Sequence, residues 1–158
     1  MAVIKTRADY HKETKWFSVM QPNHTEPANK SKKGDCVIRA FSIAADLTWL
    51  QAFDVLVENA RKTYNIPNGQ QNYEQVFAAW GFASSSVKAV KGESRMTLEG
   101  FCKSHPKGRY IVSVANHLTA VVDGVCYDTW NPANKCVYKV YELKDKEAYN
   151  GCKRMQGL

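Results

Sequence analysis

Three residue types that together can perform acyl transfer occur in this chain in a usable order: the thiol of Cys36, the imidazole of His117 and the carboxylate of Asp128. A cysteine attacks a carbonyl carbon only as a thiolate, whereas the pKa of a free thiol is roughly 8.5. The positive end of a helix and a neighbouring imidazolium both lower that pKa. The three residues therefore form a candidate catalytic triad if the fold brings them together.

The sequence around Cys36 predicts that it lies at the start of a helix. Apolar residues recur at helical spacing from Val37 to Ala45, and Asp35 is of a type that favours the N-cap position. Cys36 then falls in the first turn. Cys102 is expected within a short helix, and the other three cysteines in strands or in the C-terminal tail, so none of them has this placement.

A predicted hairpin connects the other two residues of the triad. Asp123-Gly124 is a strong signal for a two-residue type I′ turn between two strands. With that turn Thr119 faces Asp128, and His117 lies on the same face as Asp128, diagonal to it. Diagonal neighbours in a sheet are roughly 7–8 Å apart, within reach of a hydrogen bond between side chains. The carboxylate could then orient the imidazole and stabilise its cation.

The order of patterns along the chain predicts an α+β domain, with helices before antiparallel strands. We expect a polar, irregular N-terminal arm over residues 1–33, the folded domain over 34–145, and a tail over 146–158. The expected helices are 35–45, 48–60, 72–80 and one from 97 to before 106; the expected strands are 110–115, 118–122, 125–130 and 137–143.

Composition excludes several classes of protein. The 158 residues contain no apolar stretch near the roughly 20 residues of a membrane span, and no secretory signal is recognisable at the N-terminus. An odd number of cysteines, five, without a CxxC pair predicts neither a disulfide framework nor a metal site, and no cofactor is implied. We therefore expect a cytoplasmic protein without membrane association.

The net charge of +7 raises the question of nucleic-acid binding. Much of the excess lies at residues 5–15, 30–33 and 153–154, and no basic stripe recurs at helical spacing with aromatic residues between. The pattern favours a solvated basic surface, and nucleic-acid binding is the weakest of the functions considered.

The sequence resembles the papain-like cysteine peptidase fold in three segments: Gly34-Asp-Cys-Val-Ile-Arg-Ala40, Asn116-His-Leu-Thr-Ala-Val-Val-Asp-Gly124 and Tyr127-Asp-Thr-Trp130. It is most similar to small uncharacterised bacteriophage proteins related to the C39-like, bacteriocin-processing peptidases. The resemblance covers about residues 28–142. It implies N-terminal helices packed on a C-terminal antiparallel sheet, with Cys36 as nucleophile, His117 as base and Asp128 as orienting group.

One position departs from the pattern of that family. Papain-like enzymes carry a Gln a few residues before the nucleophile, whose amide helps to bind the oxyanion, and here Lys30 lies six residues before Cys36. Asn29 is the nearest amide, so we expect it to point into the cleft as the second oxyanion donor. Loss of such a donor costs other hydrolases roughly 10²–10³ in rate.

Two functions stay open at this point. The first is a thiol hydrolase that acts on a peptide or protein, or transfers the acyl group to an amine. The alternative is a weakly active or inactive papain-fold phage protein that binds a host macromolecule, such as a host protein. Each residue alone also has a structural explanation: Cys36 as a small buried hydrophobe, His117 as an ordinary strand residue, and Asp128 as the cap of the following turn.

Overall fold

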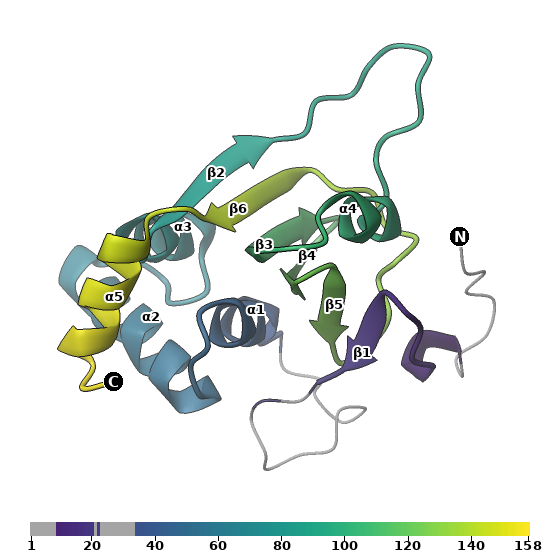
Figure 1. Cartoon of the computed structure of the whole chain (residues 1–158). Helices are drawn as coiled ribbons and strands as arrows, with labels where there is room; N and C mark the ends of the chain where they lie inside the picture. The colour runs from purple at the N-terminus through teal and green to yellow at the C-terminus, as the bar shows by residue number, and fades with distance from the viewer. Residues whose placement is uncertain (1–8, 21, 23–33) are drawn as a thin grey trace.

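The computed structural model describes residues 9–20, 22 and 34–158, which form a mixed α+β structure around a six-stranded sheet (Figure 1). The strand order is β1-β5-β4-β3-β6-β2. The helices are α1 (Cys36–Ala44), α2 (Trp49–Thr63), α3 (Gln70–Ala79), α4 (Leu98–Ser104) and α5 (Lys146–Met155), with a 3₁₀ turn η1 (Asp9–His11). The strands are β1 (Phe17–Val19), β2 (Phe82–Ser86), β3 (Arg109–Val114), β4 (His117–Val122), β5 (Val125–Asp128) and β6 (Lys139–Leu143).

The predicted α+β class is confirmed, but the sheet is mixed rather than wholly antiparallel. β1 pairs in parallel with β5, so that Phe17 lies beside Cys126. β1 belongs to the segment predicted to be irregular. Phe17 is only 1% exposed, and burial of its ring brings the backbone alongside β5, which would otherwise present an unpaired edge.

The β4–β5 hairpin has the predicted register. Val122 pairs with Val125, as a two-residue turn requires. Asp123 and Gly124 have φ angles of 49° and 77°, both in the left-handed region that a type I′ turn demands. The turn therefore fixes which side chains of β4 and β5 share a face.

Three of the four predicted helix starts are confirmed. α1 begins at Cys36 after Asp35, α2 has the capping box between Thr48 and Gln51, and α4 begins after Thr97. The prediction that Asn72 caps the third helix is wrong, because α3 begins at Gln70. Asn72 is fully buried inside that helix, where its amide donates to the carbonyl oxygens of Leu56 and Pro67. This asparagine ties α3 to α2 and to the loop between them.

Two further elements have no counterpart in the sequence prediction. β2 is a serine-rich strand without apolar alternation, and its antiparallel pairing with β6 defines it. α5 occupies most of the segment predicted to be a tail. Asp145 caps it by accepting a hydrogen bond from the backbone of Ala148, and the Tyr149 hydroxyl donates to the carbonyl oxygen of Ala45.

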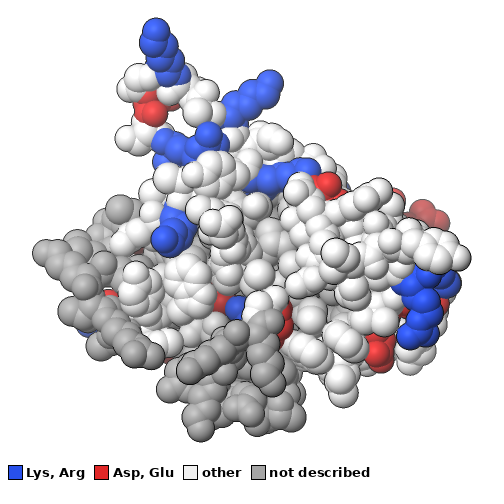
Figure 2. Space-filling view, turned by 180° about the vertical axis from the view of Figure 1, so that it is seen from behind, with Lys and Arg blue, Asp and Glu red and all other residues white. Residues whose placement is uncertain are grey.

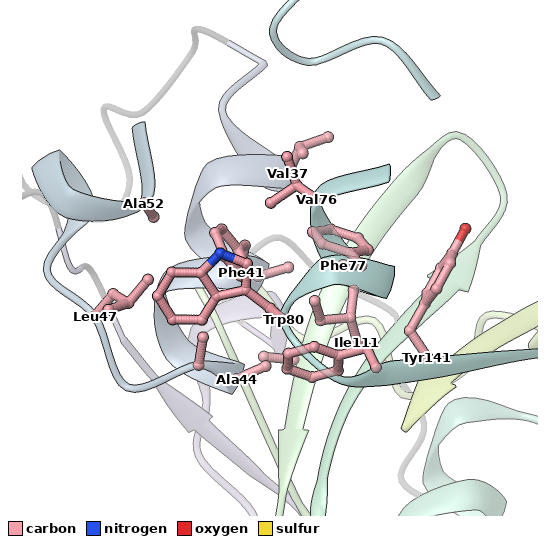
Figure 3. Close-up of a cluster of buried hydrophobic side chains, with 14 of the residues drawn as sticks. Val37, Phe41, Ala44, Leu47, Ala52, Val76, Phe77, Trp80, Ile111 and Tyr141 are labelled. Carbon is pink, nitrogen blue, oxygen red and sulfur yellow. The ribbon is translucent and has the colours of Figure 1, made fainter. Parts of the chain in front are cut away.

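Aromatic packing fixes α1 against α3 and the sheet. The ring of Phe41 lies 5.4 Å from that of Phe77 and 5.3 Å from that of Trp80, edge to face in the second case (Figure 3). Ile111 and Tyr141 of the sheet join the same buried cluster. A second buried cluster lies on the other face, under α4. Truncation of such a buried ring costs about 3–5 kcal/mol, so α1 has little freedom to shift.

Candidate active site

Cys36 is the first residue of α1 and is half-buried. Gly34, with φ of 61°, lets the chain turn into the helix at a backbone conformation that other residues rarely adopt. The unpaired N–H groups of the first turn give this end of the helix a partial positive charge. The local structure therefore places the thiol where a thiolate is stabilised.

His117 begins β4 and Asp128 ends β5, and the imidazole Nε2 lies 2.6 Å from the carboxylate Oδ2. Asp128 is only 3% exposed. Burial by itself would raise the pKa of Asp128, but the hydrogen bond and the charge of His117 lower it. The carboxylate is thus ionised, and it fixes the direction of the ring.

Cys36 lies close enough to His117 for the imidazole to lower the pKa of its thiol. Because the imidazole Nε2 is bonded to Asp128, Nδ1 is the ring nitrogen left available to the thiol. Burial raises the pKa of Cys36, but the bond to His117, the backbone N–H of Leu118 and the charge of His117 together lower it. Burial also opposes protonation of His117, yet its bonds to Asp128 and Cys36 raise its pKa to about 9. The arrangement therefore favours a thiolate–imidazolium pair at neutral pH.

Two further side chains, those of Trp130 and Arg39, lie beside the triad. The indole of Trp130 lies 4.8 Å from the His117 ring and covers it. Arg39 is buried one turn after Cys36 and pairs with both Asp35 and Asp128. The spacing of Asp35 and Arg39, four residues apart in a predicted helix, was a signal for this pair.

A cleft of about 310 Å³ opens beside the thiol. One wall comes from the first turn of α3, through Gln70 and Tyr73, and the other from the end of β3 and the β3–β4 turn, through Ser113 and Asn116. These groups are polar but uncharged. These side chains can therefore offer hydrogen bonds to a group beside the thiol without adding a charge.

The predicted oxyanion donor Asn29 and the neighbouring Lys30 lie outside the described residues. Among the described residues, Gln70 and Asn116 bring side-chain amides to the cleft beside Cys36. The amide of Gln70 donates to Glu74 at 3.2 Å. Sequence analysis missed Gln70 because it lies 34 positions after Cys36 and reaches the cleft only through the packing of α3.

The other cysteines have different surroundings. Burial raises the pKa of Cys102 to about 12, and burial likewise raises the pKa values of Cys126 and Cys152. All five cysteines are free thiols. The lowered pKa of Cys36 thus distinguishes it from these three cysteines.

Lys and Arg side chains gather on the projecting segment between β2 and α4 (Figure 2). This segment, residues 87–96, carries Lys88, Lys91 and Arg95 against one acidic residue, Glu93. The sequence analysis had placed the basic clusters elsewhere. In the described ranges no group of three or more His, Cys, Asp or Glu side chains is arranged to hold a metal ion.

Over the same described residues, no single helix has both the length and the apolarity to cross a membrane; α1 and α2 meet those criteria only together, as a pair bent by 113°. Comparison of the chain with protein-family models, curated proteins and solved structures finds no match.

Proposed function

We propose that this protein is a thiol hydrolase with a papain-like fold, in which Cys36 is the nucleophile, His117 the general acid and base, and Asp128 the orienting carboxylate. The observation that carries the proposal is the meeting of three groups: Cys36 and His117 line one cleft, and His117 is hydrogen-bonded to the buried Asp128. The fold supports the proposal as well, because α1 carries the thiol at its first residue and β4 carries the imidazole at its first residue.

The geometry supports a two-step reaction on a peptide, isopeptide or related acyl compound. The thiolate of Cys36 attacks the carbonyl carbon and forms a C–S bond, and the carbonyl electrons move to oxygen. When the tetrahedral intermediate collapses, the C–N bond breaks and the leaving amine takes the proton from His117 Nδ1. Water then gives a proton to His117 and attacks the thioester, the C–S bond breaks, and the acid leaves, which restores the thiolate–imidazolium pair. An amine in place of water would give acyl transfer.

Throughout this cycle Asp128 stays ionised and keeps Nδ1 directed at the reacting atoms. Burial of the carboxylate strengthens its interaction with the imidazolium, because little water screens it. The resemblance noted in the sequence adds a bacteriophage origin and action in the host cytoplasm to the proposal.

A binding protein built on the same fold is the second candidate. The projecting segment 87–96 supports it, because an exposed segment with an excess of basic residues is typical of a surface that attracts an acidic macromolecule. In that case Cys36 would retain its surroundings without turning over a substrate.

An activated ester separates the two candidates without knowledge of the natural substrate. With p-nitrophenyl acetate we expect a burst of one nitrophenolate per protein, accompanied by one acetyl group on Cys36 in the intact mass, and then continued release as water hydrolyses the thioester. A burst on Cys36 without continued release would favour the binding protein, which keeps the same thiol but does not turn over. Cys36→Ala should abolish the burst, whereas Cys102→Ala is the matched control at a buried thiol and should retain it. A burst of equal size in Cys36→Ala, or acetylation spread over several cysteines, would exclude the hydrolase and leave the binding protein.

A further inference from the structure

Arg39 is a charged residue buried in the interior, 6% exposed, with a carboxylate on each side of it. One guanidinium nitrogen, Nη1, bonds to Oδ1 of Asp35, and Nη2 lies 3.4 Å from Oδ1 of Asp128. Asp35 also accepts a hydrogen bond of 3.1 Å from the indole of Trp49. This network joins the consecutive helices α1 and α2 to β5, which lies far from both in sequence.

The network continues into the triad without a break. Asp128 uses Oδ1 toward Arg39 and the backbone N–H of Thr129, and Oδ2 toward His117. The signs of charge therefore alternate along this network of side chains, which runs from Asp35 through Arg39, Asp128 and His117 to Cys36. A buried charge is expensive unless a partner of opposite sign lies beside it, so each member stabilises the ionised form of the next.

We propose that Arg39 is a positioning residue for the triad: it holds Asp128 ionised and turned toward His117, and it clamps the N-terminus of α1, with Cys36, onto the sheet. The inference rests on the proposed function, since it assigns Arg39 a role in setting the reactivity of the same thiol. Arg39 acts through Asp128.

The chemistry of arginine suits this role. The planar guanidinium presents its donors in a fixed fork and can contact two carboxylates at once, whereas the ammonium of a lysine is a single point charge on a flexible chain. The helix supplies the direction: Arg39 lies three residues after Cys36, so both side chains project from nearly the same side of α1. The residue that bears the nucleophile and the residue that holds the orienting carboxylate are thereby parts of one rigid element.

The test is the rate of Cys36 alkylation by iodoacetamide as a function of pH, which reports the thiolate without need of a substrate. Arg39→Gln should lower the rate at pH 6 about tenfold and shift the profile to higher pH, since one unit of pKa is a factor of ten in thiolate. Arg39→Lys should give a smaller loss, about threefold, because it keeps the charge but loses the fork. Thermal unfolding shows which variants are folded.

A double-mutant cycle with Asp128→Ala tests whether Arg39 acts through that carboxylate. In the Asp128→Ala background Arg39→Gln should lower the pH 6 rate by less than about twofold, because only the direct charge effect on the thiol remains. An equal loss in both backgrounds would overturn the inference. If Arg39→Gln does not fold, the same cycle with Arg39→Lys decides.

Arg109 supplies the matched control, because it is an arginine of β3 whose side chain contacts the other end of α1. Its guanidinium donates to the carbonyl oxygens of Ile43 and Ala44, the end of the helix opposite to Cys36. Arg109→Gln should lower the unfolding temperature and leave the alkylation profile in place. A similar shift in Arg109→Gln would show that any loosening of α1 suffices and would also overturn the inference.

The proposed function can fail separately. If His117→Ala leaves the alkylation profile unchanged, the thiolate–imidazolium pair itself is absent and the hydrolase proposal falls. If His117→Ala shifts the profile but neither Arg39 variant does, only the role of Arg39 is refuted.

Discussion

Two Cys–His pairs of this protein occupy opposite faces of the sheet and have opposite properties. Cys36 lies in the first turn of α1, half-buried at a cleft that it shares with His117, a histidine 81 positions away that lowers the pKa of its thiol. Cys102 lies in the last turn of α4, 1% exposed, with His105 only three residues further on. The Nδ1 of His105 lies 2.9 Å from the carbonyl oxygen of Phe101, on whose ring it stacks.

The difference shows that closeness in sequence does not create a reactive thiol. The C-terminal end of a helix carries a partial negative charge, which disfavours a thiolate, and the burial of Cys102 raises its pKa to about 12. Cys36 lies at the positive end of a helix and opens onto a cleft. It also has the imidazole of His117 beside it, whose Nδ1 is not used by Asp128. The position of each thiol relative to a helix end and to solvent therefore distinguishes the reactive Cys36 from the buried Cys102.

The largest expected effect is the contrast in alkylation between these two thiols. At pH 7 iodoacetamide should modify Cys36 at least ~10³-fold faster than Cys102, because Cys102 reacts only when the protein opens, which a stability of about 5–15 kcal/mol makes rare. Peptide mapping by mass spectrometry measures both rates in one sample. Comparable rates for the two thiols would remove the distinction.

His117→Ala should bring Cys36 closer to an ordinary cysteine. Without the imidazolium the pKa of the thiol rises toward roughly 8.5, so the alkylation rate at pH 6 should fall by at least about tenfold. His105→Ala is the matched control and should leave the rate of Cys36 unchanged. A loss of the same size in His105→Ala would mean that the substitutions act through general loosening of the fold.

The smallest expected effect concerns how the free energy of unfolding depends on pH. The raised pKa of His117 gives a contribution that is fully present below roughly pH 6.5, the pKa in the unfolded chain, and is lost as the pH rises through about 9. The lowered pKa of Cys36 gives the opposite: its contribution is present above roughly pH 8.5 and is lost as the pH falls through the folded-state value. Between these limits the pH dependence that His117 gives to the unfolding free energy is offset, in the wild type, by that of Cys36.

Cys36→Ala leaves only the His117 slope, since Asp128 still holds the imidazolium. We therefore expect the variant to lose about 1 kcal/mol of unfolding free energy relative to the wild type between pH 6.5 and 8.5. Urea denaturation at pH 6.5, 7.5 and 8.5 measures it. Cys102→Ala should show no such slope in this range, because its thiol is protonated in both states until roughly pH 8.5. If the unfolding free energies of Cys36→Ala and wild type differed by the same amount at all three pH values, the Cys36–His117 ion pair would be contradicted.

The sequence was sufficient for the parts of the molecule that local patterns control. The start of α1 at Cys36 and the Asp123-Gly124 turn were both predicted, and together they placed the thiol at a helix end and His117 near Asp128. These features depend on caps and turns, which are properties of a few neighbouring residues.

The rest depends on contacts between distant segments. β1 and β2 are strands only because β5 and β6 pair with them, and the serine-rich β2 has no pattern of its own. Asn72 was predicted as a cap because its type favours that position, but its buried amide is used to tie two helices together. Gln70 reaches the cleft through the packing of α3. Local propensity cannot reveal such placements, because tertiary contacts override it.

The two-residue turn between β4 and β5 makes the candidate site sensitive to chain length as well as to residue type. One residue inserted after Gly124 would shift the pairing of β5 by one position and turn each of its side chains to the other face. The position opposite Thr119 would then carry the phenol of Tyr127 in place of the Asp128 carboxylate. The spacing of eleven residues between His117 and Asp128 is therefore as much a part of the candidate site as the residues themselves. Insertions in this turn should be far less tolerated than insertions in the projecting segment 87–96.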